Sequence, residues 1–375
     1  MQERRGTLPT TRRFDAGERA TLRRELAPFC APPSARATLA VASGLMLYAG
    51  FVAGALLLQP VGWRILCSVA IAPAAGRLFM RAHDAAHGSL TSSRRLNSLL
   101  GRVAFLPTLH PESIWAQLHN REHHVFTNLR TRDRTWAPLS PAEYDGLPRW
   151  RQARYRLYRT TAGFGVYHLV ELWWKQFLFP RGTVLRRRSV VHLLDQLLVL
   201  AFVGVVVGAA GVSAAWRPWP WIAATGLVLA LPLVVFAYIA GFVGYCHHTH
   251  PSVRWWDDER AWRRESRQLD TAVQLTFSPF VSRLLGDVME HPAHHIEPRV
   301  SLARLRDAQG RLRELVGDAA VVQRWSWRTH RETVARCKLY DFDRSRWQGF
   351  PARGHRGGAV GARPTESPCG ITRGS

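Results

Sequence analysis

The sequence predicts an all-α integral membrane protein with four transmembrane helices in two hairpins and a cytosolic helical cap that carries a histidine-ligated dimetal site. Two observations lead to this prediction. Four long apolar runs occur in two close pairs along the 375-residue chain, and each is long enough to cross a hydrocarbon core of about 30 Å. Eleven of the sixteen histidines lie in four short clusters outside these runs.

The two hairpins follow from the spacing of the apolar runs. Gln59 and Pro60 separate the first two runs, and the short segment 216–220, which contains two tryptophans suited to a membrane interface, separates the last two. In the second run, Arg64 and Arg77 lie near the ends, where a long side chain can snorkel to the polar boundary. The predicted transmembrane helices are residues 38–58, 61–82, 193–215 and 221–245.

The charge distribution predicts the orientation of these helices. The formal net charge is +24, and eight arginines lie in a basic, partly ordered N-terminal segment, residues 1–37. Many more lie between residues 81 and 192, whereas the two hairpin connections hold a single arginine, so the positive-inside rule places both termini and every histidine cluster in the cytosol. Dispersed arginines around apolar runs argue against nucleic-acid binding. We expect a protein of the bacterial cytoplasmic membrane whose main domain, residues 38–350, precedes a disordered tail, residues 351–375.

Shorter segments are expected to build the cytosolic part. Leu99–Leu109 is apolar but too short to span, so it is expected to lie along or dip into the interface. Thr161–Pro180 is rich in aromatic residues and is typical of an interfacial helix, with a cytosolic core helix as the alternative. A second lobe, residues 246–345, includes a periodic Arg/Leu helix around Ser301–Val316.

The histidine clusters have the composition and spacing of a metal site. Imidazole is the commonest protein metal ligand near neutral pH, and histidines three or four residues apart share one face of a helix. The sets expected to point the same way are His83 with His87, His119 with His123, and His291 with His294 and His295. The chain has no CxxC pair, no HExxH motif and no repeated Glu-x-x-His pair, which leaves an all-imidazole site with enough ligands for two metals. The isolated histidines are expected to be capped or hydrogen-bonded groups: His110, His168, His192, His330 and His355.

Three of the clusters resemble the histidine boxes of the membrane fatty acid desaturases, which read HxxxH, HxxxHH and HxxHH. The resemblance covers roughly residues 38–345. Box one is His83 and His87; box two is His119, His123 and His124; box three is His291, His294 and His295. The family uses one more histidine ahead of box three, which His248 matches, while the roles of His247 and His250 stay open. These nine family-matched residues are the metal ligands that the resemblance implies.

Three further stretches look most like the acyl-lipid Δ12 (omega-6) branch of this family. They read DRTWAP at 133–138, HHTHP at 247–251 and HHIEPR at 294–299. Box one reads HDAAH, where that branch often has Cys-Gly between the histidines, and Glu297 precedes Pro298 where a small or apolar residue is usual. These departures leave the metal ligands intact and put the exact substrate in doubt.

The resemblance implies an enzyme that uses two iron ions (Fe2+/Fe3+) and O₂ to place a cis double bond in a fatty acyl chain of a membrane lipid. Because the HPGG haem motif of a fused cytochrome b5 domain is absent, electrons are expected from a separate soluble carrier such as ferredoxin. Candidates for holding the imidazoles in orientation are Asp84, Asn120, Glu122 and Glu290, with His250 as a further candidate ligand and a surface salt bridge as the alternative for Glu122.

Two other functions share some of these features. A hydroxylase, ketolase or acetylenase of the same superfamily has the same boxes and differs in the shape of its substrate channel. A non-enzymatic membrane binding protein on the same scaffold would be expected to have degraded boxes or ionisable residues within the spans. The intact boxes and the clean interiors of the four runs disfavour that second alternative.

Overall fold

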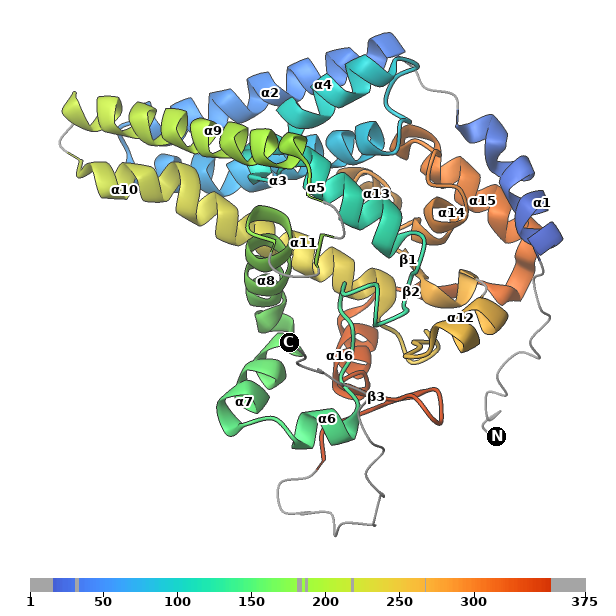
Figure 1. The fold of residues 1–375 in the computed structure, drawn as a ribbon. Coiled ribbons are helices and arrows are strands. Elements are labelled where there is room, and N and C mark those ends of the chain that lie inside the picture. The colour runs from blue at the N-terminus through green and yellow to red at the C-terminus, as the bar shows by residue number, and fades with distance from the viewer. Residues whose placement is uncertain are drawn as a thin grey trace, which may run out of the picture.

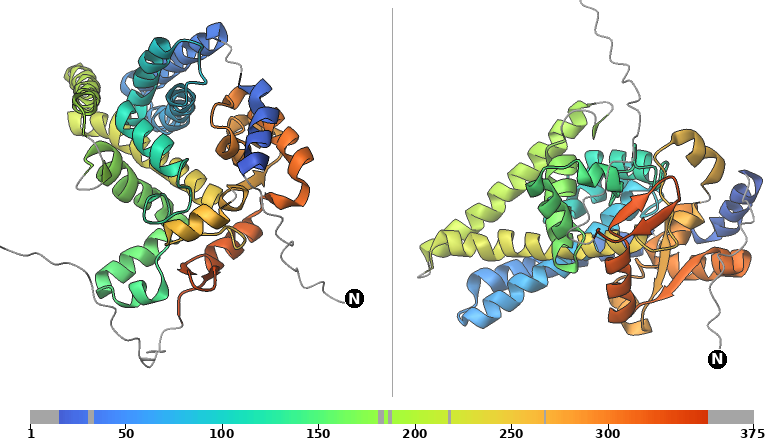
Figure 2. Two further views of the ribbon diagram at one scale, coloured as in Figure 1. Left: turned by 45° about the vertical axis from the view of Figure 1, so that its right-hand side comes forward. Right: turned by 90° about the horizontal axis from the view of Figure 1, so that it is seen from below.

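The computed structural model describes residues 16–30, 34–180, 184–185, 188–216, 219–266 and 268–351. Long helices lie side by side and project from a lobe of shorter helices, as Figure 1 and the right-hand view in Figure 2 show. The helices that are long and apolar enough to cross a membrane are Ala35–Leu57, Val61–Ala86, Val190–Ala215 and Trp221–His248. The predicted fold class is confirmed in this part of the chain: a mainly helical protein with four candidate spans and a histidine cluster that could hold metal.

The spans have the predicted hairpin order, but each reaches three or four residues further than expected at one end. The first hairpin is α2 (Ser34–Leu57) and α3 (Val61–Ala86). The second is α9 (Val190–Ala215) followed by three joined helical segments, namely α10 (Trp221–Thr225), the π-helix η7 (Gly226–Ala230) and α11 (Leu231–His248). Both α3 and α11 therefore run past the predicted ends at 82 and 245 and carry histidines on their last turns.

A glycine sets the end of α3 after box one. The segment 81–86 contains no glycine or proline, so nothing in it interrupts the helix. Gly88 then adopts a left-handed conformation (φ 72°), and its N–H donates to the Ala85 carbonyl, which satisfies an end carbonyl of the helix. Box one is thus held on the rigid last turn of a membrane-length helix.

Arg64, near one end of its apolar run, packs inside the protein and is not exposed. Its side chain is buried, and Nε donates to the Ala55 carbonyl of α2 at 2.8 Å. The guanidinium also lies 4.2 Å from the ring centroid of Trp219, in the connection of the second hairpin. A carbonyl near the end of α2 has no hydrogen-bond partner within the helix, so it can accept from the Arg64 guanidinium. Together with the contact to Trp219, this hydrogen bond links the two hairpins.

Short helices form the lobe beyond the ends of the spans. The segment predicted at Leu99–Leu109 is helical and packs against α3, and the aromatic segment 161–180 is helical and packs against α11. Between the hairpins lie α4 (Arg94–Phe105), η2 (Leu106–Thr108), α5 (Glu112–Gln117), the π-helix η3 (Leu118–His123), α6 (Pro141–Asp145), α7 (Arg149–Tyr158), η4 (Thr161–Gly163), α8 (Phe164–Tyr167) and the π-helix η5 (His168–Leu178). After α11 follow α12 (Glu259–Glu265), η8 (Leu269–Thr271), α13 (Pro279–Leu284), α14 (His291–Ile296), η9 (Leu302–Arg304), α15 (Leu305–Val316), η10 (Gly317–Ala319) and α16 (Trp327–Arg336).

The lobe also contains strands, which were not predicted from the sequence. Strands β1 (Val273–Thr276) and β2 (Val321–Arg324) pair in parallel, and β3 (Leu339–Asp341) and β4 (Arg346–Gln348) pair antiparallel. Each strand has only three or four residues, too few for a clear alternation of apolar and polar positions. The described part of the fold remains mainly helical.

Part of the predicted N-terminal segment is an ordered helix, α1 (Ala16–Leu26), which is followed by η1 (Ala27–Phe29). Leu22 and Leu26 of α1 are buried in one apolar cluster with Ile296 of α14. Arg23 Nε donates to the Ile296 carbonyl at 2.9 Å. The N-terminal helix therefore covers the helix that carries box three (Figure 1). Residues 1–15 and the predicted tail after residue 351 lie outside the described residues.

A carboxylate from the second hairpin fixes the start of the helix that leads into box two. Asp195 on α9 is buried and accepts a hydrogen bond from the Ser113 backbone N–H at 2.8 Å, in the first turn of α5. It also pairs with Arg102 Nε of α4 at 2.7 Å. An accepting carboxylate at this end satisfies an unpaired backbone donor and suits the helix dipole. Because α5 continues without a break into η3, this contact determines where box two lies.

Candidate metal centre

Four segments from distant parts of the chain bring nine imidazoles together. Box one is at the end of α3, box two on and just after η3, His248 at the end of α11, and box three on α14. The ring nitrogens form two groups, and within each group the ligand atoms all lie within 4.8 Å of one another. Group one is His83, His87, His119, His124 and His294; group two is His123, His248, His291 and His295.

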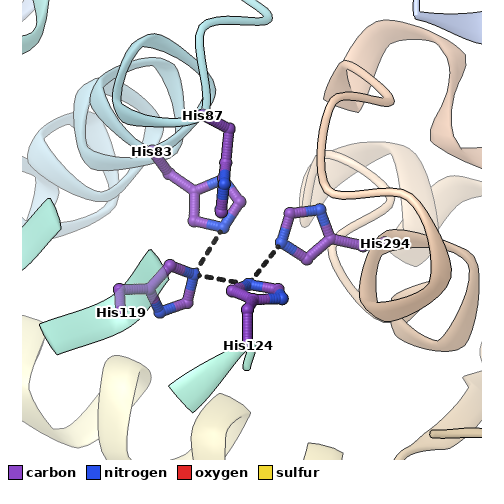
Figure 3. Close-up of side chains that lie close together, drawn as sticks. All are labelled: His83, His87, His119, His124 and His294. Carbon is purple, nitrogen blue, oxygen red and sulfur yellow. Dashed lines mark hydrogen bonds between the residues drawn. The ribbon is translucent and has the colours of Figure 1, made fainter. Parts of the chain in front are cut away.

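In group one, the rings converge from three helical segments (Figure 3). His119 Nε2 lies 3.2 Å from His83 Nε2 and 2.9 Å from His124 Nε2. His294 Nε2 reaches the same cluster from α14, 3.1 Å from His124 Nε2. The Nε2 atom of His87 is buried and has no hydrogen-bond partner among the described residues. Five nitrogens are thus directed at one another.

In group two, all four imidazoles are buried. His291 Nε2 lies 3.1 Å from His248 Nε2 and 2.8 Å from His295 Nε2. The His123 ring completes the group, with its centroid 4.7 Å from that of His248 and 5.1 Å from that of His295. The family-matched extra histidine, His248, therefore lies with boxes two and three.

The two groups divide box two differently from the expected alignment. His119 and His123 are four residues apart and were expected to point the same way, but they belong to different groups. The cause is the π-helix η3, in which the His124 N–H donates to the His119 carbonyl at 2.9 Å. This wider turn aligns residues five apart, so His124 joins His119 and His123 turns to the other group.

Box three is divided as well. His291 and His295 are four apart on α14 and share group two, as the helical spacing predicts. His294, which was expected to face with them, points instead to group one. The helix places His294 about 100° from its neighbour His295, so one short helix supplies both groups.

The arrangement fits metal ions better than it fits a hydrogen-bonded histidine cluster. Two facing imidazole nitrogens form a hydrogen bond only if one of them carries a proton, and each cluster brings several nitrogens to a common centre. Burial first, and neighbouring imidazoles second, lower the pKa of His87, His119, His124, His291, His294 and His295 well below the ordinary value. Neutral imidazoles keep the lone pair that a metal binds, and without thiolates they suit iron, copper or zinc.

The remaining sequence candidates lie around the two groups. The Asp84 carboxylate accepts from the Leu302 backbone N–H at 3.1 Å, and its other oxygen is 3.7 Å from His83 Nδ1. Asn120 Nδ2 donates to the Ala86 carbonyl at 2.8 Å. Glu290 accepts a hydrogen bond from Gln274, and Glu122 pairs with Arg132.

The two histidines whose roles stayed open are placed differently. The His247 ring stacks on His291 with centroids 3.6 Å apart, but His247 is in neither group. His250 is half-buried, and its Nδ1 accepts from the Ser252 backbone N–H at 3.1 Å. His247 therefore lies against group two without joining it, and His250 is in neither group. Of the isolated histidines, His110 contacts the Thr108 carbonyl and His330 contacts Thr161, and His355 lies outside the described residues.

The sequence did not predict which residues hydrogen-bond to the Nδ1 atoms of the group-two rings. His123 Nδ1 donates to the Asp133 carboxylate at 2.9 Å, and Asp133 is buried. His248 Nδ1 donates to the Thr271 carbonyl at 2.8 Å, and His295 Nδ1 lies 3.2 Å from Thr127 Oγ1. Asp133 stood in the DRTWAP stretch, so a signal was present, but no spacing linked it to His123.

A cleft of about 550 Å³ reaches the site from the surface. His119 of group one and His123 of group two both line it. Its other walls are mixed polar and apolar side chains: Leu118, Glu122, Thr131, Arg132, Asp133, Arg134, Thr135, Gln176, Phe177, Val184 and Leu185. A second, small enclosed cavity lies between the spans and is lined by Leu109 at the end of the predicted interfacial segment.

Comparison with known proteins agrees with this site. The family model "Fatty acid desaturase" matches residues 60–327. The sn-1 oleoyl-lipid 12-desaturase of Picosynechococcus sp. is 27% identical over 267 residues, which are 70% of this chain and 73% of that protein. The chloroplastic omega-6 fatty acid desaturase of Glycine max is 27% identical over 71% of this chain and 60% of its own length. The ferredoxin-dependent sn-1 acyl-lipid omega-3 desaturase of Synechocystis sp. is 26% identical over 64% of this chain and 65% of its own.

The matched region contains α3, η3, α11 and α14, and so all three histidine boxes and His248. These relatives are named as an oleoyl-lipid desaturase and a fatty acid desaturase, and desaturases are oxidoreductases. The chain therefore belongs to the fatty acid desaturase family and is an enzyme of that class.

Proposed function

We propose that the chain is an O₂-dependent di-iron desaturase that places a cis double bond in a lipid-linked fatty acyl chain, at the Δ12 position. The observation that carries this proposal is the convergence of nine imidazoles into two buried groups, with ring nitrogens facing one another. The Δ12 assignment is supported by relatives named for that position, in a cyanobacterium and in chloroplasts as omega-6. An omega-3 desaturase also matches the chain, so the position of the double bond is a more specific proposal than the desaturation itself.

The nine imidazoles are proposed as the ligands of the two irons, five in group one and four in group two. Bound there, a reduced di-iron centre with O₂ supplies the oxidant that an unactivated methylene requires. Overall, two vicinal C–H bonds are lost, one C=C bond forms, and O₂ with two electrons and two protons yields two waters. The chain's own contribution is to direct neutral imidazoles at two common centres and to bury seven of the nine away from bulk water.

The reaction is tested by expression in a host that makes no polyunsaturated lipids, followed by fatty-acid analysis of its membranes. We expect a new diene with its second double bond at Δ12, formed only in air and absent from a His295→Ala variant. A diene at another position would correct the regiochemistry alone. Hydroxy, keto or acetylenic products in place of the diene would favour the related oxidases, and no oxidised product would favour a binding protein.

The electron donor is proposed to be a ferredoxin or a similar acidic carrier that docks on the arginine-rich face. One relative is named as a ferredoxin-dependent enzyme, and the net charge of this chain is +24. On α12, Arg260, Arg263 and Arg264 are exposed, and Arg263 pairs with Glu259. Trp262 of the same helix donates from Nε1 to the Thr127 carbonyl beside box two, so this surface lies close to the metal groups.

Charge reversal at Arg263 and Arg264 should therefore raise the donor concentration needed for half-maximal turnover and leave the rate at saturating donor nearly unchanged. Added salt should have the same effect, because the Debye length is only about 8–10 Å near physiological ionic strength. Steady-state kinetics with donor and lipid varied separately measures this. Arg328→Glu is the control, since Arg328 is also exposed and also pairs with a glutamate four residues away. If neither salt nor charge reversal alters the donor concentration that is required, this surface is not the docking site. If only the affinity for lipid changes, the arginines bind anionic lipid head groups instead.

The membrane orientation is also a proposal. The arginine distribution favours a cytosolic position for the histidine boxes, in the bacterial cytoplasmic membrane. The four candidate spans are an even number, which is consistent with both ends of the domain on one side. A soluble donor in the cytosol could then reach the site directly.

A further inference from the structure

The two metal groups differ in how the backs of their imidazole rings are held. In group two, three of the four rings use Nδ1 to contact a protein acceptor: His123 to Asp133, His248 to the Thr271 carbonyl, and His295 to Thr127. Asp133 is itself fixed, because its carboxylate accepts from the backbone N–H groups of Asn128 and Thr135 at 3.1 and 2.9 Å. These contacts fix the tautomer and the rotation of each ring.

Group one has no comparable support within the described residues. His83 Nδ1 and His124 Nδ1 are buried without a hydrogen-bond partner, and the oxygen nearest to His83 Nδ1, on Asp84, is 3.7 Å away. That separation is beyond hydrogen-bonding distance. No contact from a back nitrogen to a protein acceptor is found for the other three rings of the group in the described part of the chain. The ligands of group one therefore lack the hydrogen bonds that fix the ring orientation in group two.

Exposure adds to this difference. His87 and His119 of group one are half-buried, whereas all four rings of group two are buried. His119 lines the 550 Å³ cleft, so a small chelator in that cleft meets a group-one ligand directly. His123 also lines the cleft, but its ring is held from behind by the buried Asp133.

We infer that the two metals are held unequally, with group two as the firmly bound site, Asp133 as its main positioning residue, and group one as the site that loses its metal first. This inference rests on the proposed ligation of iron by the two groups. Acceptors behind ligating imidazoles are each associated with about 10–100-fold in metal affinity. Group one has one more imidazole, which should strengthen its binding of metal. The larger effect is expected from the acceptors behind the rings, because three rings of group two have one and, among the described residues, no ring of group one does. A site that exchanges its metal more readily would also be the one that is filled last during maturation of the enzyme.

The test is the release of iron from the purified full-length enzyme, loaded with two ferrous ions and kept anaerobic, to an excess of bipyridyl. Absorbance of the chelate follows release, and elemental analysis of the protein counts what remains. We expect two phases of equal amplitude. Protein loaded with ⁵⁷Fe and stopped between the phases should lose one of two ferrous Mössbauer signals and keep the other.

Substitutions show which phase of iron release belongs to which group. Asp133→Asn should accelerate the slow phase about 10–100-fold and leave the fast phase unchanged. Thr127→Val should accelerate the slow phase too, and Thr127→Ser, which keeps the hydroxyl behind His295, should restore it. Asp307→Asn is the control, because Asp307 is exposed and pairs with Arg304.

The outcomes separate this inference from the proposed function. Release of both irons in a single phase from the unaltered enzyme, or acceleration of the fast phase by Asp133→Asn, would overturn the inequality of the sites. If Asp133→Asn does not fold, the wild-type time course and the Thr127 pair still decide the question. Protein that binds no iron, or is active with zinc alone, would instead refute the ligand assignment on which the inference rests.

Discussion

Replacing His295 by alanine is expected to reduce desaturation to background and to lower the iron content of the purified enzyme. His295 is one of only four imidazoles in group two, and its Nε2 lies 2.8 Å from that of His291. Its loss leaves three protein ligands and removes the ring that Thr127 holds from behind. Metal sites with few spare ligands lose both affinity and activity when one is removed. Iron per chain and the diene content of membranes are the two measurements.

Two histidines outside the groups provide matched controls. His330 contacts Thr161 Oγ1 at 3.0 Å through Nε2, and His250 accepts from the Ser252 backbone. His330→Ala and His250→Ala should both keep two irons and most of the activity. Full activity in His295→Ala would show that the ligand set is wrong, and loss of iron in His250→Ala would add His250 to it.

Replacing Gly241 by alanine is expected to destabilise the enzyme strongly, although the change adds a single methyl group. Gly241 lies in α11 where this helix crosses α8, and a Cβ there would be 2.2 Å from the Phe164 carbonyl oxygen and 3.2 Å from His168 Cβ. The first contact is with backbone, so no rotamer change can relieve it and the helices must separate. Overpacking of this kind costs about 1–3 kcal/mol, and a clash with backbone belongs at the upper end. Small residues allow membrane helices to approach closely, and Gly241 serves that purpose here.

The same change should reach the metal centre, because α11 ends at His248 of group two. We expect Gly241→Ala to lower the melting temperature in detergent and to reduce iron occupancy in parallel. Gly208→Ala in α9 is the control: a Cβ at that position has nothing within 4 Å. Alanine is the better helix former, so Gly208→Ala should be neutral or stabilising. Equal melting temperatures for the two variants would contradict the close approach of α8 and α11.

The sequence by itself determined which parts of the chain form long apolar helices and which histidines come together in groups that could hold metal. Hydropathy depends on local composition, and residues 38–58 and 197–215 carry no charged side chain, so helices α2 and α9 lie within a few residues of the predicted bounds. The spacing of the histidine boxes is also local, and all nine family-matched histidines lie in the two groups. The short strands β1 to β4 escaped prediction because three or four residues show no clear alternation, and the pairing of β1 also depends on β2, which is distant in the chain.

Only the tertiary structure decided how the ligands divide between the two groups. That division depends on a π-helix at box two, whose i→i+5 hydrogen bond no spacing rule indicates, and on the angle at which α14 meets the end of α3. Asp133 lies ten residues from His123 and is brought to its Nδ1 atom by a turn in which Asn128 has φ 61°. Asp195 holds the start of α5 from a different hairpin, 82 residues away in the chain. Such contacts between separate helices are fixed by packing of the whole chain, whereas composition and spacing describe only residues close together in sequence.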